Sequence, residues 1–167
     1  MKNLQAQKGF TLVEIAIVLV IIGLLLGGVL KGQELIQNSK VKSVTQDFEN
    51  ISAAYYAYKD RTGDYPTDDG TDVVGNFWED LRTEGFLTGL ATDGVGPDHS
   101  LDGLFSYSSA ADGGFALGTK HLCASNIDGA DAINIDNKLD DGVFSSGTIR
   151  AAAAYVVDTK AVLCKEL

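Results

Sequence analysis

The longest hydrophobic run of the chain lies near its start, between Phe10 and Leu30. Within this run only Thr11 and Glu14 have polar side chains. At roughly 1.5 Å per residue, a helix of this length spans about 30 Å, the thickness of the hydrocarbon core of a bilayer. The pattern therefore predicts a membrane-spanning helix. Glu14 is unexpected there, because a buried charge costs about 2.5 to 3.5 kcal/mol even on the mildest insertion scale and usually marks a function.

After Lys31 the pattern changes to a single apolar stripe. Its members recur at intervals of three and four residues, the period of an amphipathic helix: Val41, Val44, Phe48, Ile51, Tyr55 and Tyr58. Polar residues fill the other faces, and no strong helix breaker occurs before Gly63. We expect one helix from about residue 10 to 61, with a hydrophobic part (10–30) and an amphipathic continuation (31–62).

Such a helix is about 75 to 80 Å long, which is more than a head of about 100 residues can cover. Its first half must therefore be buried against lipid or against the same half of other helices. A coiled-coil dimer is the alternative explanation of the stripe, although only about three heptads are present.

Residues 63–167 are polar and rich in glycine and aspartate, as expected for a small globular head. The fold class that we expect is α+β, with the long helix packed on a small antiparallel sheet. The predicted strands are 104–108, 115–123 and 152–163. Short helices are predicted around residues 77–84 and from Asp128, as its N-cap, to near Gly142.

The formal net charge is −10, which disfavours broad electrostatic binding of nucleic acids. Cys123 and Cys164 are the only cysteines. If the head crosses the membrane into an oxidising compartment, a disulfide between them is the natural interpretation. Two buried free thiols are the alternative. A zinc site would need two more ligands, and His99 and His121 lack a tight spacing to the cysteines.

Three interpretations of residues 1–30 compete: a cleaved secretory signal, a permanent anchor, and a prepilin leader followed by a retained helix. A secretory signal has a small-x-small cleavage site beyond a short apolar core. The far side here reads "GGVLKGQELIQ" and offers no Ala-x-Ala. The N-terminal end of the apolar run distinguishes the three interpretations better. There the short leader "MKNLQAQKG" is followed directly by "FTLVE" and a long apolar run.

Residues 8–30 closely resemble the type IV prepilin family. The resemblance implies a leader of residues 1–9, which prepilin peptidase removes after Gly9 on the cytoplasmic face, and a mature chain that starts at an N-methylated Phe10. It also implies membrane insertion as a prepilin, and assembly by inner-membrane machinery into a helical filament of identical subunits at the cell surface. Pseudopilins of type II secretion share this signature.

Many family members have a proline just past the apolar run, where this chain has Lys31. The glycines of this region form two G-x-x-x-G spacings, which permit close approach of helices: Gly23, Gly27, Gly28 and Gly32. Glycine is also simply common in membrane helices. The adjacent pair Gly27 and Gly28 is expected to replace the proline as the weak point, because glycine has a low helix propensity.

Several aspartates lie close together in the second half of the head: Asp128, Asp131, Asp136, Asp140 and Asp141. Carboxylate oxygens suit Ca²⁺, and related pseudopilins hold calcium in loops near the end of the head. The spacing does not match an EF-hand, so a solvated acidic loop with capping aspartates is the alternative to a calcium site at Asp136, Asp140 and Asp141. No catalytic motif or other cofactor fingerprint occurs, and we expect no enzymatic activity.

The expected function is therefore structural: a pilin subunit that packs through its N-terminal helix. In the filament, Glu14 is expected to pair with the amine of Phe10 on a neighbouring subunit, because each charge alone is costly in an apolar core. Thr11 assists by hydrogen bonding or is an ordinary N-terminal helix residue. The alternatives are a pseudopilin and a membrane-anchored binding protein that never assembles; a disulfide near the C-terminus, which the pilin resemblance includes, favours the pilin.

Overall fold

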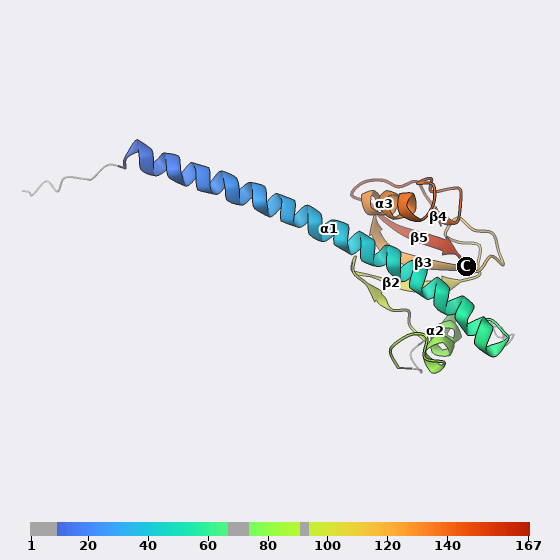
Figure 1. The fold of residues 1–167 in the computed structure, drawn as a ribbon. Coiled ribbons are helices and arrows are strands. Elements are labelled where there is room, and N and C mark those ends of the chain that lie inside the picture. Colours follow the sequence, from blue (N-terminus) through green and yellow to red (C-terminus); the bar gives the residue numbers. More distant parts are fainter. Residues whose placement is uncertain (1–9, 67–73, 91–93) are drawn as a thin grey trace, which may run out of the picture. The chain divides into compact units, whose positions relative to one another are not determined.

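The computed structural model describes residues 10–66, 74–90 and 94–167. The chain divides into two compact units, residues 1–38 and 39–167, which are described separately below. The predicted leader, with Gly9, lies outside the described residues. The expected α+β class is confirmed, because a long N-terminal helix is followed by shorter helices and an antiparallel sheet (Figure 1).

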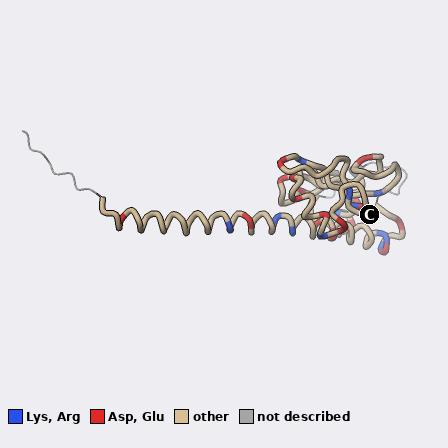
Figure 2. The backbone as a smooth tube through the Cα atoms, turned by 90° about the horizontal axis from the view of Figure 1, so that it is seen from above, with Lys and Arg blue, Asp and Glu red and all other residues tan. Residues whose placement is uncertain are grey.

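The long helix, α1, runs from Leu12 to Thr62 as predicted. In the first unit it has no covering layer among the described residues, and every side chain from Phe10 to Leu30 is exposed. Charged residues are sparse along this part of the helix and frequent in the second unit (Figure 2). By length and composition α1 is able to cross a membrane.

In the second unit the predicted stripe of α1 is the helix face that is buried. Its buried members are Val41, Val44, Phe48, Ile51, Ser52, Ala54 and Tyr55, and Tyr58 is partly buried. Apolar side chains three and four positions apart lie on one helix face, so the stripe gives the sheet a continuous surface to pack on.

The second unit contains one five-stranded antiparallel sheet with the strand order β1-β2-β3-β5-β4. The strands are β1 (Asp98–His99), β2 (Gly103–Ser108), β3 (His121–Asp128), β4 (Ile149–Ala151) and β5 (Lys160–Glu166) (Figure 1). Strand β3 is central, and its pairing with β5 shifts register between Ala124 and Ile127. This β-bulge includes Asn126, whose φ is 60°.

Two of the three predicted strands were placed wrongly. The strand predicted at 115–123 begins only at His121, because Phe115–Lys120 forms turns closed by the bonds from Gly118 N to Ser109 O and from Thr119 N to Ala116 O. The strand predicted at 152–163 begins only at Lys160. The apolar residues 152–157 form a loop, and a turn from Val156 to Thr159 ends it. The prediction of 104–108 is confirmed as β2.

Both short helices are confirmed. Helix α2 covers Val74–Thr83, and helix α3 covers Gly129–Leu139. Asp128 caps α3, since its carboxylate accepts a hydrogen bond of 3.0 Å from Ala130 N.

The hydrophobic core of the second unit lies between the α1 stripe and the inner face of the sheet. The ring of Phe48 meets the edge of Phe105 on β2, with centroids 5.1 Å apart. Phe77 of α2 stacks on Tyr107 at 4.2 Å. Alternate residues of a strand face opposite sides, so the inner face presents Leu122 and Ala124 to the core. The outer face carries His121 and Cys123.

Candidate functional site

The start of α1 is built by a reciprocal capping arrangement. Thr11 precedes the first helical residue, and Glu14 is the third residue of the helix. The Oε2 atom of Glu14 accepts from Thr11 N at 2.8 Å and from Thr11 Oγ1 at 2.7 Å. In return, Thr11 Oγ1 accepts from Glu14 N at 3.3 Å. The spacing T-x-x-E is the capping-box pattern, which satisfies helix N–H groups that have no partner in the preceding turn.

This cap changes the interpretation of Glu14. Within a single chain the carboxylate has a local partner, and its negative charge also lies at the favourable end of the helix dipole. Within the single chain Thr11 bonds to Glu14 and caps the helix, and its assistance to Glu14 in assembly stays a prediction. The T-x-x-E spacing was the sequence signal for this arrangement. Phe10 is 85% exposed, and with residues 1–9 attached its nitrogen is an amide rather than a free amine.

The four glycines of the first unit lie inside continuous helix. A Cβ atom added at Gly23, Gly27, Gly28 or Gly32 would meet no other heavy atom within 4 Å. The fold of the single chain therefore does not require glycine at these positions. Their expected roles in close helix packing and as a weak point stay predictions about the assembled state.

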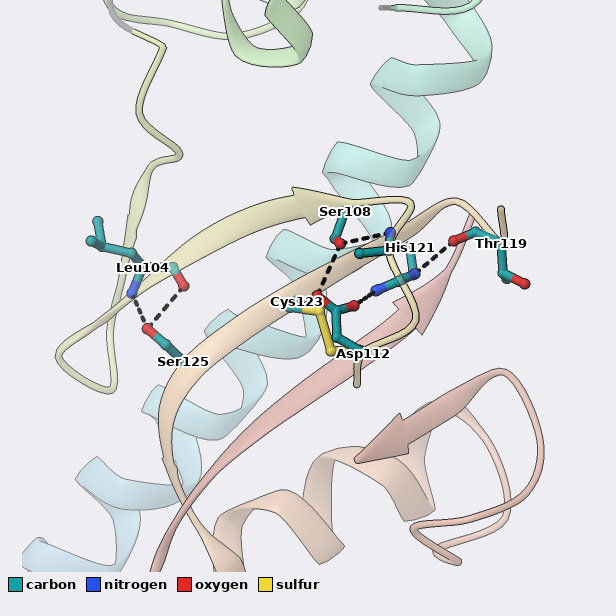
Figure 3. The surroundings of a disulfide bond; sticks show 9 residues. Leu104, Ser108, Asp112, Thr119, His121, Cys123 and Ser125 are labelled. Atoms are coloured by element: carbon teal, nitrogen blue, oxygen red, sulfur yellow. Dashed lines mark hydrogen bonds and ion pairs between the residues drawn. A yellow bond between two sulfur atoms is a disulfide. The ribbon is translucent and has the colours of Figure 1, made fainter. Parts of the chain in front are cut away.

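The predicted disulfide is present. Cys123 and Cys164 are directly opposite each other on β3 and β5, and their Sγ atoms are bonded. Both cysteines are buried in a small cluster with Phe115. Figure 3 shows the disulfide at Cys123, together with His121 and Asp112. His121 lies close to the two sulfur atoms, but sulfurs that are bonded to each other are not the thiolates that a metal site needs. The interpretation as free thiols was wrong.

The acidic segment brings together Asp136, Asp140 and Asp141, whose carboxylate oxygens lie within 4.8 Å of one another. Asp128 and Asp131 lie apart from this cluster, at the start of α3. The three carboxylates already accept hydrogen bonds from segments of the chain that follow α3. Asp136 accepts from Tyr155 Oη at 2.7 Å, and Asp141 accepts from Ser146 Oγ at 2.8 Å. The predicted alternative was a solvated acidic loop with capping aspartates; Asp136, however, is fully buried, and the calcium site stays a prediction.

The electrostatics of this loop follow from burial. Asp136 is fully buried, and burial raises the pKa of its carboxyl, with the neighbouring Asp141 and Asp140 adding to the shift. Burial, together with the bond to Asp136, also raises the pKa of the Tyr155 hydroxyl, so Tyr155 remains a hydrogen-bond donor at any physiological pH.

Two polar side chains that the sequence did not indicate join distant segments: the half-buried Lys165 and the buried His121. Lys165 Nζ donates to Ser52 Oγ at 2.9 Å and so ties β5 to α1; burial lowers the pKa of this amine. His121, at 0% exposure, contacts Asp112 and Thr119 beside the disulfide. No local pattern marks either pair, because the partners are brought together only by the sheet.

Comparison with known proteins gives one family match. The model of the prokaryotic N-terminal methylation motif matches residues 4–30. A comparison with curated protein sequences found no match. Among solved structures, the chain is similar to the major type IV pilin PilA1 from Clostridium difficile, with 16% identity and a TM-score of 0.49 over 78% of this chain and 96% of that one.

The family match covers the same residues that form the exposed apolar helix and its Thr11–Glu14 cap. A long N-terminal helix and a small antiparallel sheet complete the arrangement. The chain therefore carries a prokaryotic N-terminal methylation motif that extends over the apolar first part of α1.

Proposed function

We propose that the chain is a structural, non-catalytic subunit of a type IV pilus. It inserts into the inner membrane as a prepilin, prepilin peptidase removes residues 1–9 after Gly9, and the N-terminal amine of Phe10 is methylated. The assembly machinery then moves the subunit into a filament at the cell surface, where α1 packs against α1 of other copies.

One observation carries this proposal. The helix that coincides with the methylation motif exposes apolar side chains on all its faces, including Leu12 at 91% and Leu24 at 73% exposure. Exposed apolar surface of this extent is unfavourable in water. Lipid covers such a helix before assembly, and copies of the same helix cover it in a filament.

Glu14 has a specific place in this scheme. Cleavage after Gly9 turns the Phe10 nitrogen into a positive amine, four residues before the carboxylate. In a filament, the amine of a neighbouring subunit pairs with Glu14 while Thr11 continues to donate to the carboxylate, which has more acceptor capacity than the cap uses. A charge pair inside an apolar bundle penalises wrong axial registers, because a shifted subunit leaves both charges unpaired.

Mass spectrometry of sheared surface filaments tests the proposal. The expected result is an abundant chain that begins at Phe10, is 14 Da heavier than the unmodified sequence through one methyl group, and contains an intact disulfide. A chain that stays in the inner membrane, with no filaments containing it, would contradict the proposal. That outcome would favour a membrane-anchored binding protein.

A pseudopilin of type II secretion is the second candidate. The Cys123–Cys164 disulfide supports the pilin, because the resemblance to pilins includes a disulfide near the C-terminus. Deleting the chain separates the two: loss of long surface filaments supports the pilin, whereas loss of secreted proteins with filaments unchanged supports the pseudopilin.

Calcium binding at Asp136, Asp140 and Asp141 stays a prediction of the sequence. The three carboxylates are near enough to share an ion, but their present bonds are to the chain itself. Calorimetric titration of chelator-treated protein tests the site, with Asp141→Asn as the variant. If titration of millimolar Ca²⁺ into the protein releases no more heat than titration into buffer, the predicted calcium site is wrong.

A further inference from the structure

A cavity of about 190 Å³ opens in the second unit between α1 and the β1–β2 edge of the sheet. Its polar lining is Asp47 and Asn50 of α1 and Asp98 of β1. Its apolar lining comes from α1, from β2 and from the segment between α2 and β1: Ile51, Leu87, Pro97 and Phe105. A largely apolar cavity with a few polar groups is the usual composition of a binding site in proteins.

The two carboxylates of this cavity lack a partner of opposite charge. Among the residues that the structure describes, neither Asp47 nor Asp98 forms an ion pair or a side-chain hydrogen bond. Burial raises the pKa of the Asp47 carboxyl, which means that its charge is poorly solvated. A cation placed in the cavity would offset part of this desolvation cost.

Charged groups on the adjoining elements do not supply that cation. Lys40 of α1 lies 3.8 Å from Asp102. His99 of β1 attracts the charge of Asp47, but burial lowers the pKa of His99 below 6.5, so the ring is largely neutral at pH 7. Lys42 borders the exposed side of the same stretch of α1 and forms no ion pair with Asp47 in the described structure. A cation for the cavity therefore has to come from another molecule.

The other side of the sheet carries an apolar surface with a single cation. This surface consists of residues 151–154 and Val156, which follow β4, and of the start of β5. Val156 is 57% exposed and Val162 is 47% exposed. Among the described residues that line this surface, Lys160 is the only charged one; it is exposed and forms no ion pair with a described residue.

The cavity and the surface around Lys160 complement each other in charge and in polarity. The aliphatic stem of a lysine packs on apolar groups while its ammonium reaches a carboxylate. The strand order places β1 and β2 at one side of the sheet and β5 and β4 at the other, so a single chain does not join the two surfaces (Figure 1). Contact between unlike surfaces of identical chains is heterologous, and it repeats into an open helical assembly when the rotation does not close.

We propose that the cavity between α1 and the β1–β2 edge is a socket for Lys160 of a second copy of the chain. This inference rests on the proposed filament and specifies one contact between neighbouring subunits. The ammonium of Lys160 binds at the carboxylates of Asp47 and Asp98, and the apolar residues beside Lys160 pack on the apolar lining of the socket. Each subunit offers one socket and one lysine, so the contact passes from copy to copy in one direction. It also reduces the repulsion between chains whose formal net charge is −10.

Cross-linking of sheared filaments with a water-soluble carbodiimide tests the contact. The reagent activates a carboxyl group, and a lysine amine then displaces the activating group as a urea, which leaves an amide with net loss of one water. Mass spectrometry after proteolysis should show Lys160 joined to Asp47 or Asp98. The same chain held as a monomer in detergent micelles should not give this product. Filaments in which Lys160 is joined only to other carboxyls, or in which the socket is joined to another lysine, would overturn the proposal.

Charge reversal gives a second readout. Lys160→Glu and Asp98→Lys should each lower the filament yield about two- to fivefold, the range for one partly exposed ion pair. The double variant should recover yield relative to both single variants, because the pair is formed again with its charges exchanged. The matched control is Lys138→Glu, at an exposed lysine in the last turn of α3, and it should stay close to the wild type.

Two further observations keep the outcomes distinct. Urea unfolding followed by Trp78 fluorescence checks that the single variants fold, since Asp98 and Lys160 are both exposed. If the wild-type chain forms no filaments, the proposed function itself is wrong. If wild-type filaments form and the folded double variant recovers no yield, the socket is wrong and the proposed function remains.

Discussion

Residues 12–38 and 39–62 belong to one α-helix, but they differ in how their apolar side chains are covered. In the first unit the chain buries none of the side chains from Phe10 to Leu30. In the second unit a single stripe is buried under the sheet, with Phe48 at 0% exposure. Helical structure is the same in both, so the difference lies in the number of apolar faces. One sheet is enough to bury a stripe on one face of a helix, whereas a helix that is apolar on all faces needs partners on every side to bury its side chains.

The comparison separates two kinds of stability. Apolar side chains of the second half are buried within the chain and contribute to the folding of the subunit itself, whereas those from Phe10 to Leu30 are exposed and make no such contribution within a single chain. Trp78, the only tryptophan, is buried in the second unit, so its fluorescence reports unfolding of that unit alone.

The largest expected difference comes from matched truncations in the two halves. Phe48→Ala should lower the free energy of unfolding by about 3 to 5 kcal/mol, because it leaves a cavity against Phe105. Ile21→Ala, at a residue that is 51% exposed, should leave it unchanged. Urea unfolding in detergent, followed by Trp78 fluorescence, measures both. A comparable loss in Ile21→Ala would show that the first half supports the head.

The disulfide should have the next largest effect, again confined to the second unit. The two cysteines are separated by 41 positions, and the loop-entropy model gives about 4 kcal/mol for a loop of this size. Cys164→Ser should therefore lower the stability of the head and reduce the yield of surface filaments. Helicity of residues 12–38, measured by hydrogen exchange in micelles, should not change; a loss of protection there would break the separation between the units.

Replacing both Gly27 and Gly28 by alanine addresses the first half alone. Helix propensity predicts a gain of about 1 to 2 kcal/mol in local helix stability, since the added Cβ atoms meet no other heavy atom within 4 Å. Hydrogen exchange of residues 20–35 should slow, and filaments should become stiffer or fail to form. Filaments of unchanged stiffness, with slowed exchange, would show that the glycine pair is not the weak point.

Glu14→Ala should cost the isolated chain only about 1 kcal/mol of local helix stability, the usual value of an N-terminal cap. Insertion and cleavage after Gly9 should remain, because the apolar run and the glycine are intact. Filament yield should nevertheless fall strongly. The control is Thr11→Ala, which removes the side-chain half of the cap and keeps the carboxylate. Equal filament yields in the two variants would mean that capping, and not pairing with an amine, is the role of Glu14.

The smallest effect concerns acid and belongs to the second unit. Burial lowers the pKa of His99 below that of the unfolded chain, so the unfolded state takes up a proton first as the pH falls. Stability should therefore decrease from pH 7.5 to pH 5.5 more in the wild type than in His99→Gln. Urea unfolding at the two values gives the difference, and identical pH dependence in both proteins would contradict this assignment.

The sequence by itself determined the features that depend on local pattern. The all-round apolar run and the stripe from Val41 to Tyr58 set the extent of α1, and Asp128 marked the start of α3, because both signals are read within a few turns of helix. The expected cleavage junction at Lys8-Gly9-Phe10 and the unusual carboxylate of Glu14 were also recognised from the local sequence. The disulfide was inferred because both cysteines lie in a head that the apolar run is expected to send across a membrane into an oxidising compartment.

The tertiary structure decided what depends on contacts between distant segments. Phe115 and the apolar residues 152–157 have strand-like composition, yet they form loops, because Phe115 covers the disulfide and a turn at Val156–Thr159 interrupts the other segment. Composition cannot distinguish an apolar residue that covers a sheet from one that belongs to it. The same reason hides the pairs His121–Asp112 and Lys165–Ser52: strands β2, β3 and β5 and the stripe of α1 bring them together only when the sheet has formed.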